Sequence, residues 1–148
     1  MHCRRGRVMT TEVRIASCSC GQLTLTISAA PVRVSVCHCL ACQRRTGSVF
    51  GTQARFPTDR VVVNGNSSRY LRIGDGGGRT TYNFCPFCGS TVCYSTEGQE
   101  RLTAVPVGAF SDPGFPAPIV SCYETRKHPW VVLPEGIERE DEEVDRSG

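Results

Sequence analysis

The feature that most constrains this chain is the spacing of its cysteines, which fall mainly into three tight groups. The middle group, Cys37-His38-Cys39-Leu40-Ala41-Cys42, places three thiols within six residues. The outer groups are pairs, in Cys18-Ser19-Cys20-Gly21 and in Cys85-Pro86-Phe87-Cys88-Gly89. Thiols this close together can converge on one soft cation, within the roughly 2.3 Å reach of a zinc–sulfur bond. The fold of this chain therefore has to bring the sulfurs of each group together.

The length does not explain the number of cysteines. A chain of 148 residues forms about one domain, which buries enough surface to fold without disulfides. The basic stretch 1–10 has no apolar run after it, so it does not read as a secretory signal, and we expect a cytoplasmic protein with reduced thiols. No apolar run is long enough to span a bilayer, which argues against a membrane-embedded role.

Charge is concentrated at the two ends of the chain. The formal net charge is +3, and seven thiolates on two zinc ions would bring it near neutrality. Arginines crowd residues 1–12 and carboxylates crowd residues 135–148, both with little apolar content. We therefore expect a disordered basic leader over 1–12, a folded domain over 13–134 and a disordered acidic tail over 135–148.

Between these ends, apolar and polar residues alternate with a period of two, which is typical of short strands. Residues 23–27 and 32–36 are the clearest cases, and the short break at Ala29-Ala30-Pro31 predicts a hairpin that delivers Cys37 at its end. The only helical candidate is a turn at 40–45. We expect an all-β protein, a small β-sandwich or β-tent of antiparallel strands with one helical turn. Further strands are predicted at 49–55, 60–63, 68–73, 79–84, 91–95, 102–107, 119–123 and 130–133.

The pair Cys85 and Cys88 has the sequence of a metal-binding knuckle. Pro86 fixes φ after the first thiolate and Gly89 permits a left-handed backbone after the second, so the two sulfurs converge. Paired with Cys18 and Cys20 from another part of the sheet, this knuckle would close a four-cysteine structural zinc site. A redox role for Cys85 and Cys88 would require a βαβ setting, which the pattern lacks.

The cysteine trio indicates a catalytic zinc site, because three protein ligands leave a position for water or substrate. Its members are Cys37, Cys39 and Cys42. Zinc on three thiolates is a weak Lewis acid, but it can accept a fourth sulfur and keep it as a thiolate at neutral pH. The pattern thus favours thiol activation. The alternative is a closed, purely structural site, completed by a fourth ligand. The candidates for that ligand are Cys93, Cys122 and His38.

Side chains next to the trio have two possible uses. Arg44 and Arg45 could bind carboxylates of a substrate or offset the negative charge of the site, and for Arg45 we expect a solvated side chain. His38 should point away from the metal if the backbone is extended, and we expect it to pack or hydrogen-bond the loop rather than to shuttle protons. Trp130 is expected in the core.

Four segments in register carry a resemblance to a known family. They are Cys18-x-Cys20-Gly21, Cys37-His38-Cys39-x-x-Cys42-Gln43-Arg44-x-Thr46-Gly47-Ser48, Phe84-Cys85-Pro86-x-Cys88-Gly89-Ser90 and Arg126-Lys127-His128-Pro129-Trp130. Over about residues 13–133 the chain resembles the glutathione-dependent formaldehyde-activating enzyme family, which includes centromere-protein-V-like proteins. The resemblance implies a β-rich fold with two zinc ions, a structural one on the outer pairs and a catalytic one on the middle trio.

The same resemblance implies a carbon–sulfur lyase that acts on S-(hydroxymethyl)glutathione, the adduct of glutathione and formaldehyde. Cys37, Cys39, Cys42 and Arg44 are then the candidate catalytic residues, and the partner is a small thiol or glutathione adduct. The alternative is a non-catalytic zinc-stabilised module that binds protein or nucleic acid. Nucleic acid is not expected, because the chain has one lysine and scattered arginines. A homo-oligomer is possible.

Overall fold

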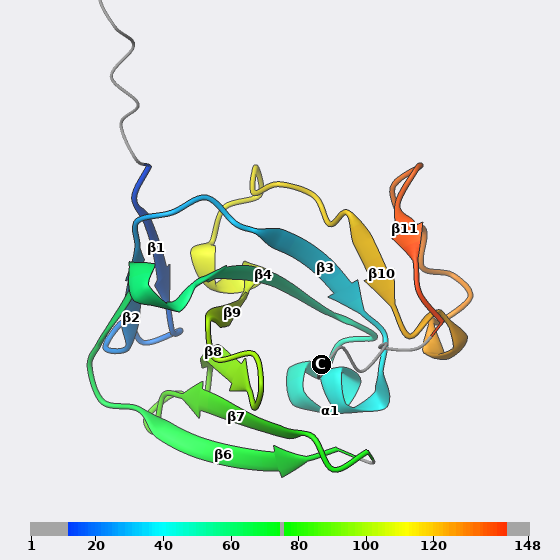
Figure 1. Cartoon of the computed structure of the whole chain (residues 1–148). Helices are drawn as coiled ribbons and strands as arrows, with labels where there is room; N and C mark the ends of the chain where they lie inside the picture. Colours follow the sequence, from blue (N-terminus) through cyan, green and yellow to red (C-terminus); the bar gives the residue numbers. More distant parts are fainter. Residues whose placement is uncertain (1–11, 75, 142–148) are drawn as a thin grey trace, which may run out of the picture.

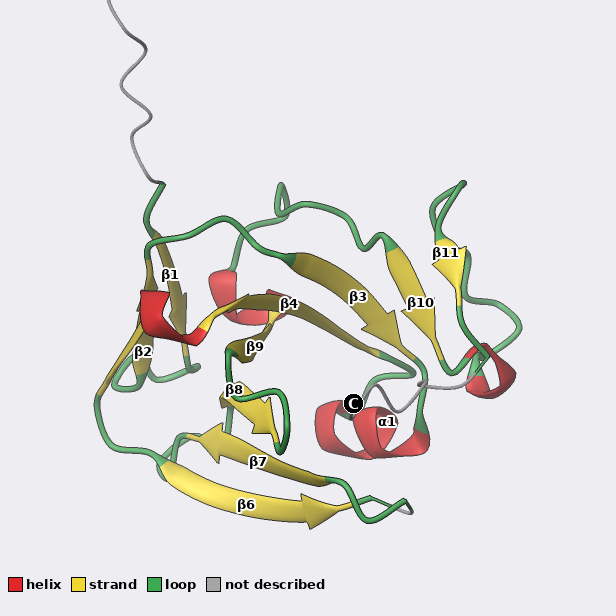
Figure 2. Cartoon of the chain, viewed as in Figure 1, coloured by secondary structure: helices red, strands yellow, loops and turns green. Residues whose placement is uncertain are grey.

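A computed structural model of the chain describes residues 12–74 and 76–141. Short strands dominate these residues, and α1 (Leu40–Thr46) is the α-helix among them (Figure 2). Three 3₁₀ turns connect strands: η1 (Thr58–Arg60), η2 (Val107–Phe110) and η3 (Glu124–Arg126). The predicted all-β class with one short helix is confirmed. Of the expected basic leader, residues 1–11 lie outside the described residues.

The strands form two sheets. The small sheet has the order β1 (Arg14–Ser17), β2 (Thr24–Ile27) and β5 (Val61–Asn64), all antiparallel. The large sheet has eight strands. Their order is β11 (Glu138–Arg139), β10 (Val120–Cys122), β3 (Arg33–Cys37), β4 (Gly51–Pro57), β9 (Leu102–Pro106), β8 (Thr91–Thr96), β7 (Arg79–Phe84) and β6 (Ser68–Ile73).

The predicted hairpin between the strands at 23–27 and 32–36 is wrong. β2 pairs with β1 and β5 in the small sheet, whereas β3 pairs with β4 and β10 in the large one. Leu25 of β2 and Val34 of β3 both lie in the same core, so the two strands belong to opposing layers instead of one hairpin. Alternation identifies the buried face of a strand but not its partner.

The core lies between the two sheets. Phe56, Leu25, Ile27 and Val105 are fully buried there. Burial of each such side chain contributes about 1.5–3 kcal/mol. Cys18 and Cys85 also belong to this cluster. One cysteine of each outer pair is therefore packed into the core.

The end of the large sheet near β10 differs from the antiparallel expectation. β10 runs parallel to β3 on one side and to β11 on the other. β11 lies within the segment 135–148, for which a disordered tail was expected; residues 142–148 of that segment lie outside the described residues. The strand predicted at 130–133 is absent from the described residues: this segment is irregular, and Trp130 is exposed and not in the core.

Helix α1 confirms the predicted helical turn, and a capping residue at each end fixes where it begins and stops. Cys39 caps its N-terminus by accepting a hydrogen bond from the Cys42 amide, and Gly47 ends it in the left-handed conformation (φ 72°). Figure 1 shows α1 between the β3–β10 end of the large sheet and the β6–β7 end. In the described part of the chain, none of the helices has the length and apolar character that a bilayer crossing requires.

Candidate metal centres and the adjoining pocket

The outer cysteine pairs meet in space. Cys18 and Cys20 lie in the turn after β1, and Cys85 and Cys88 lie in the turn between β7 and β8. All four sulfurs lie within 4.8 Å of one another; Cys20 Sγ is 3.6 Å from Cys18 Sγ and 3.7 Å from Cys85 Sγ. This four-sulfur donor set is the one that structural zinc sites use.

Hydrogen-bond donors surround these sulfurs. Backbone amides donate to Cys18 Sγ from Leu23 (3.3 Å) and to Cys85 Sγ from Phe87 (3.4 Å). Hydrogen bonds with the backbone and hydroxyl of Ser90 lower the pKa of Cys88 to about 5. Such donors favour thiolates, so the cluster fits a divalent cation. Gly89 has φ +79°, as the knuckle pattern predicted.

A side chain that the sequence reasoning missed supports the four-cysteine cluster. Gln22 Nε2 donates to Cys85 Sγ (2.9 Å) and to the carbonyl of Asn66 (2.8 Å), while Gln22 Oε1 accepts from the Asn66 amide. Gln22 thus joins the cluster to the loop after β5. Its position right after Gly21 was the only signal in the sequence.

The middle trio forms a second cluster. Cys37 ends β3, Cys39 caps α1 and Cys42 lies in its first turn, and their sulfurs lie within 4.8 Å of one another. The hairpin that was expected to deliver Cys37 is absent, yet Cys37 still ends a strand, because β4 and β10 pair with β3 on either side.

The three thiols interact strongly. Hydrogen bonds from Cys37 and Cys42 hold the pKa of Cys39 at about 2, and the Cys42 amide and the charge of Arg72 also lower it. For Cys42, the bond with Cys37 lowers the pKa, but the bond to Cys39 and burial outweigh it and raise the pKa to about 11. The bond to Cys39 raises the pKa of Cys37 as well. Only a cation would let all three ionise together, so this donor set also fits zinc.

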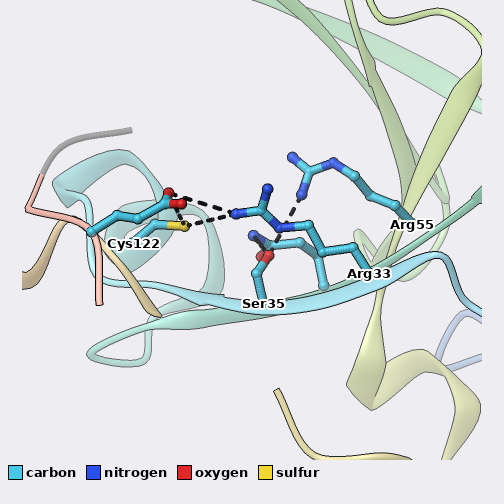
Figure 3. A network of polar contacts seen from close by, with 6 residues as sticks. Arg33, Ser35, Arg55 and Cys122 are labelled. Carbon is cyan, nitrogen blue, oxygen red and sulfur yellow. Dashed lines mark hydrogen bonds and ion pairs between the residues drawn. The ribbon is translucent and has the colours of Figure 1, made fainter. Parts of the chain in front are cut away.

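None of the three proposed fourth ligands joins the trio in the described part of the chain. Cys93 lies in the core beside Cys18 and Cys85. Cys122 lies next to Cys37 in the register of β3 and β10, but its Sγ is 3.8 Å from Arg33 Nη2 and 3.8 Å from Glu140 Oε2 (Figure 3). These contacts do not support a site closed by Cys93 or Cys122.

His38 is fully buried and turns away from the trio. Its Nε2 is 3.0 Å from Ser121 Oγ, and its ring meets Phe50 edge-on with centroids 6.1 Å apart. Burial lowers the pKa of His38, which keeps the imidazole neutral. The expectation that His38 packs against the loop agrees with this position.

The loop that carries Cys37, Cys39 and Cys42 is also held by residues 126–128. Gln43 Nε2 donates to the carbonyls of His38 (2.8 Å) and Arg126 (3.3 Å), and Gln43 Oε1 lies 3.1 Å from His128 Nε2. The Arg126–Trp130 motif therefore positions the loop from outside. The sequence placed Gln43 and His128 in motifs but did not show that they meet.

The two arginines of α1 differ in surroundings. Arg44 is exposed. The expectation of a solvated Arg45 is wrong: its guanidinium carbon lies 5.4 Å from the ring centroid of Tyr82 and 5.3 Å from that of Tyr94. The helix turns these adjacent side chains in different directions, so Arg45 faces the sheet.

Arg45 also lines a pocket of about 310 Å³ beside the trio. The pocket lies between α1 and the strands β6, β7 and β8, and the turn after Cys88 borders it. Its lining residues are Ala41, Arg45, Tyr70, Arg72, Tyr82, Phe84, Gly89 and Thr91. Arg72 had no predicted role, although the alternation of Tyr70 and Arg72 on β6 places both on one face.

The comparison with family models agrees with this geometry. Residues 13–126 match the model described as glutathione-dependent formaldehyde-activating enzyme. The chain belongs to this family. No curated protein matches it significantly. A crystal structure of a Rhodobacter sphaeroides protein, a structural genomics target, is similar to this member of the family, with 19% identity and a TM-score of 0.52. The match covers 69% of this chain and 90% of that one, and it shows a shared fold.

Proposed function

We propose that the chain is a zinc-dependent carbon–sulfur lyase that acts on a glutathione–aldehyde adduct such as S-(hydroxymethyl)glutathione. The observation that carries the proposal is the cluster of Cys37, Cys39 and Cys42 beside a pocket, with no fourth Cys, His, Asp or Glu joining it among the described residues. The match to the family model supports the class of reaction.

Two ligand sets follow from this assignment. Cys18, Cys20, Cys85 and Cys88 would hold a structural zinc, and Cys37, Cys39 and Cys42 would hold a catalytic one. When bound, zinc on three thiolates supplies an acceptor for a fourth sulfur and keeps that sulfur deprotonated. Arg72 and Arg45 place positive charge near this cluster, since they lower the pKa of Cys39 and act against the rise at Cys42.

The reaction is a simple exchange of bonds. The hydroxyl of the adduct loses its proton to solvent, its C–O bond becomes the carbonyl of formaldehyde, and the C–S bond breaks with its electron pair left on sulfur. In the other direction, the thiolate adds to the carbonyl carbon and the oxygen takes a proton. A group that stabilises the negative charge on sulfur in the transition state accelerates both directions.

The chain contributes position and charge more than proton transfer. His38 is neutral and held by Ser121, away from the trio, so we assign it no acid–base step. Arg44 is exposed beside the cluster and remains a candidate contact for a glutathione carboxylate. We expect the reaction in the cytoplasm, where thiols stay reduced; none of the nine described cysteines forms a disulfide.

The test compares one ligand from each cluster. In Cys39→Ser we expect zinc content to fall from two ions per chain to one, circular dichroism to remain that of the folded protein, and catalysed release of formaldehyde to stop. In Cys88→Ser we expect the fold itself to be lost, because the metal that Cys88 helps to bind would also be held by Cys18 and Cys85, which lie in the core. If Cys39→Ser unfolds like Cys88→Ser, the trio is structural and the chain is a zinc-stabilised binding module instead.

A further inference from the structure

One face of the β6–β7–β8 region carries a row of aromatic side chains. Tyr70 pairs with Tyr82, and Tyr82 pairs with Tyr94, in successive registers across the three strands. The rings of Tyr82 and Tyr94 have centroids 5.1 Å apart. Tyr70 and Tyr82 of this row line the pocket opposite α1, and Tyr94 is buried behind them.

Arg45 reaches across the pocket to this row. Its guanidinium contacts the rings of Tyr82 and Tyr94, an arrangement that holds a cation in place without neutralising it. Its Nε is buried and has no hydrogen-bond partner in the described part of the chain. A guanidinium that is held in place without a hydrogen-bond partner is preorganised to bind an anion, because binding then costs little further side-chain entropy.

Arg72 supplies a second positive charge from β6. It is half-buried, it lines the same pocket, and within residues 12–74 and 76–141 neither Arg72 nor Arg45 forms an ion pair with a carboxylate. The acidic side chains that do form ion pairs are Glu12, Glu97, Glu124 and Glu140, with other arginines. The pocket thus holds two positive charges without a counter-charge from an acidic residue.

The size of the pocket indicates which part of a substrate enters it. Its volume of about 310 Å³ is many times the roughly 10–15 Å³ that a cavity needs to hold one water molecule. Formaldehyde has a single carbon and would leave most of that space unfilled. The organic group attached to the thiol is large enough to use it.

We propose that this pocket binds a carboxylate-bearing organic group of the thiol substrate, with Arg72 and Arg45 as the residues that select anionic over neutral thiols. This inference rests on the proposed thiol chemistry of the Cys37–Cys39–Cys42 cluster and names the class of thiol that it takes. Arg72 and Arg45 bind the carboxylate, and Tyr70 and Tyr82 contact the body of the group.

The experiment uses a matched series of thiols. The protein with cobalt(II) in place of zinc is titrated with ω-mercapto carboxylates of increasing chain length, each paired with its neutral carboxamide. The thiolate-to-cobalt charge-transfer band reports binding of each sulfur. We expect one chain length at which the carboxylate binds about tenfold more tightly than its amide, the gain typical of one charge-assisted hydrogen bond.

The variants assign that preference to residues. Arg72→Gln and Arg45→Gln should bring the carboxylate-to-amide ratio close to one, while the affinity for the amide stays within about twofold. Arg69→Gln is the matched control, since Arg69 lies on β6 one residue from Tyr70 and points to the opposite face. Arg45→Lys, which keeps the charge, serves if Arg45→Gln fails to fold, and it should retain part of the preference. With S-(hydroxymethyl)glutathione, Arg72→Gln should raise KM about tenfold with little change in kcat.

The outcomes separate the two proposals. If amides bind the cobalt but no carboxylate is preferred, or the preference survives both arginine variants, thiol binding stands and the pocket inference is wrong. If the variants weaken carboxylates and amides equally, the arginines only balance the charge of the thiolates. If no thiol changes the cobalt spectrum, the proposed thiol chemistry itself fails.

Discussion

His38 and Ser121, 83 residues apart in the sequence, meet through a contact of 3.0 Å between Nε2 and Oγ. The amide of His38 also donates to the carbonyl of Cys122 (3.0 Å). Through these two contacts β10 fixes the residue between Cys37 and Cys39. The position of the trio therefore depends on a strand near the other end of the chain.

Removal of the Ser121 hydroxyl should destabilise the protein. Ser121→Ala leaves the buried Nε2 of His38 without a partner, which costs about 1–3 kcal/mol of unfolding free energy. Urea denaturation followed by circular dichroism measures this loss. Ser67→Ala, at an exposed serine in the loop before β6, should change stability by less than about 0.5 kcal/mol. Equal stability of the two variants would show that His38 does not need this contact.

A methyl group at Gly51 should disturb the trio. A Cβ there would lie 3.2 Å from Arg45 Nη2 and 3.6 Å from Cys42 Sγ, whereas at Gly108 it would meet nothing within 4 Å. We expect Gly51→Ala to release zinc from the trio to a chelator about tenfold faster and to weaken thiol binding, with the four-cysteine cluster unaffected. Gly108→Ala is the control. Equal rates of zinc release in both variants would mean that the site tolerates the added carbon.

Gln22 should help to retain the structural metal. Gln22→Leu removes the side-chain donor to Cys85 Sγ, and loss of such a supporting hydrogen bond typically costs 10–100-fold in metal affinity. Competition with a chromogenic chelator measures the affinity. Asn66→Ala is the matched control, because Gln22 contacts only the backbone of Asn66. If the two variants hold zinc equally well, the amide of Gln22 has no influence on the cluster.

Strand β11 should contribute to the stability of the fold. A chain that stops after Leu133 loses the pairing of β11 with β10 and the 3.6 Å ion pair between Arg33 and Glu140. We expect its Tm to fall by about 4–8 °C, which corresponds to about 2 kcal/mol for a domain of this size. A chain that stops after Asp141 keeps these contacts and should melt like the full chain. Identical melting of both truncations would place the end of the folded domain before β11.

The local patterns in the sequence predicted much of the site. Close cysteine spacing and the Pro and Gly of the Cys85–Gly89 knuckle fix local geometry, so the trio and each outer pair form as predicted. The short helix after Cys39 follows for the same reason. These features depend on a few neighbouring residues and their φ angles. The meeting of the two outer pairs was predicted from the four ligands that a structural zinc site requires, and the structure brings these pairs together.

Partners distant in sequence could not be predicted in this way. Alternation in β2 and β3 shows which residues are buried, but the same alternation fits a hairpin or two opposing layers, and the hairpin was wrong. Arg45 was expected in solvent. Its contacts, Tyr82 and Tyr94, lie on strands that the sequence around α1 does not identify as neighbours of the helix. The role of Gln22 was not predicted for a similar reason, since Asn66 and Cys85 approach it only in the folded chain.

The parallel pairing of β10 with β3 has a consequence for biosynthesis. A ribosome releases Cys37, Cys39 and Cys42 long before it releases Ser121 and Cys122, so a nascent chain carries three thiols whose supporting strand does not yet exist. The other pairs, Cys18–Cys20 and Cys85–Cys88, are complete earlier. If both clusters bind zinc as proposed, the four-cysteine site can close before β10 emerges, whereas the trio gains its supporting strand only afterwards.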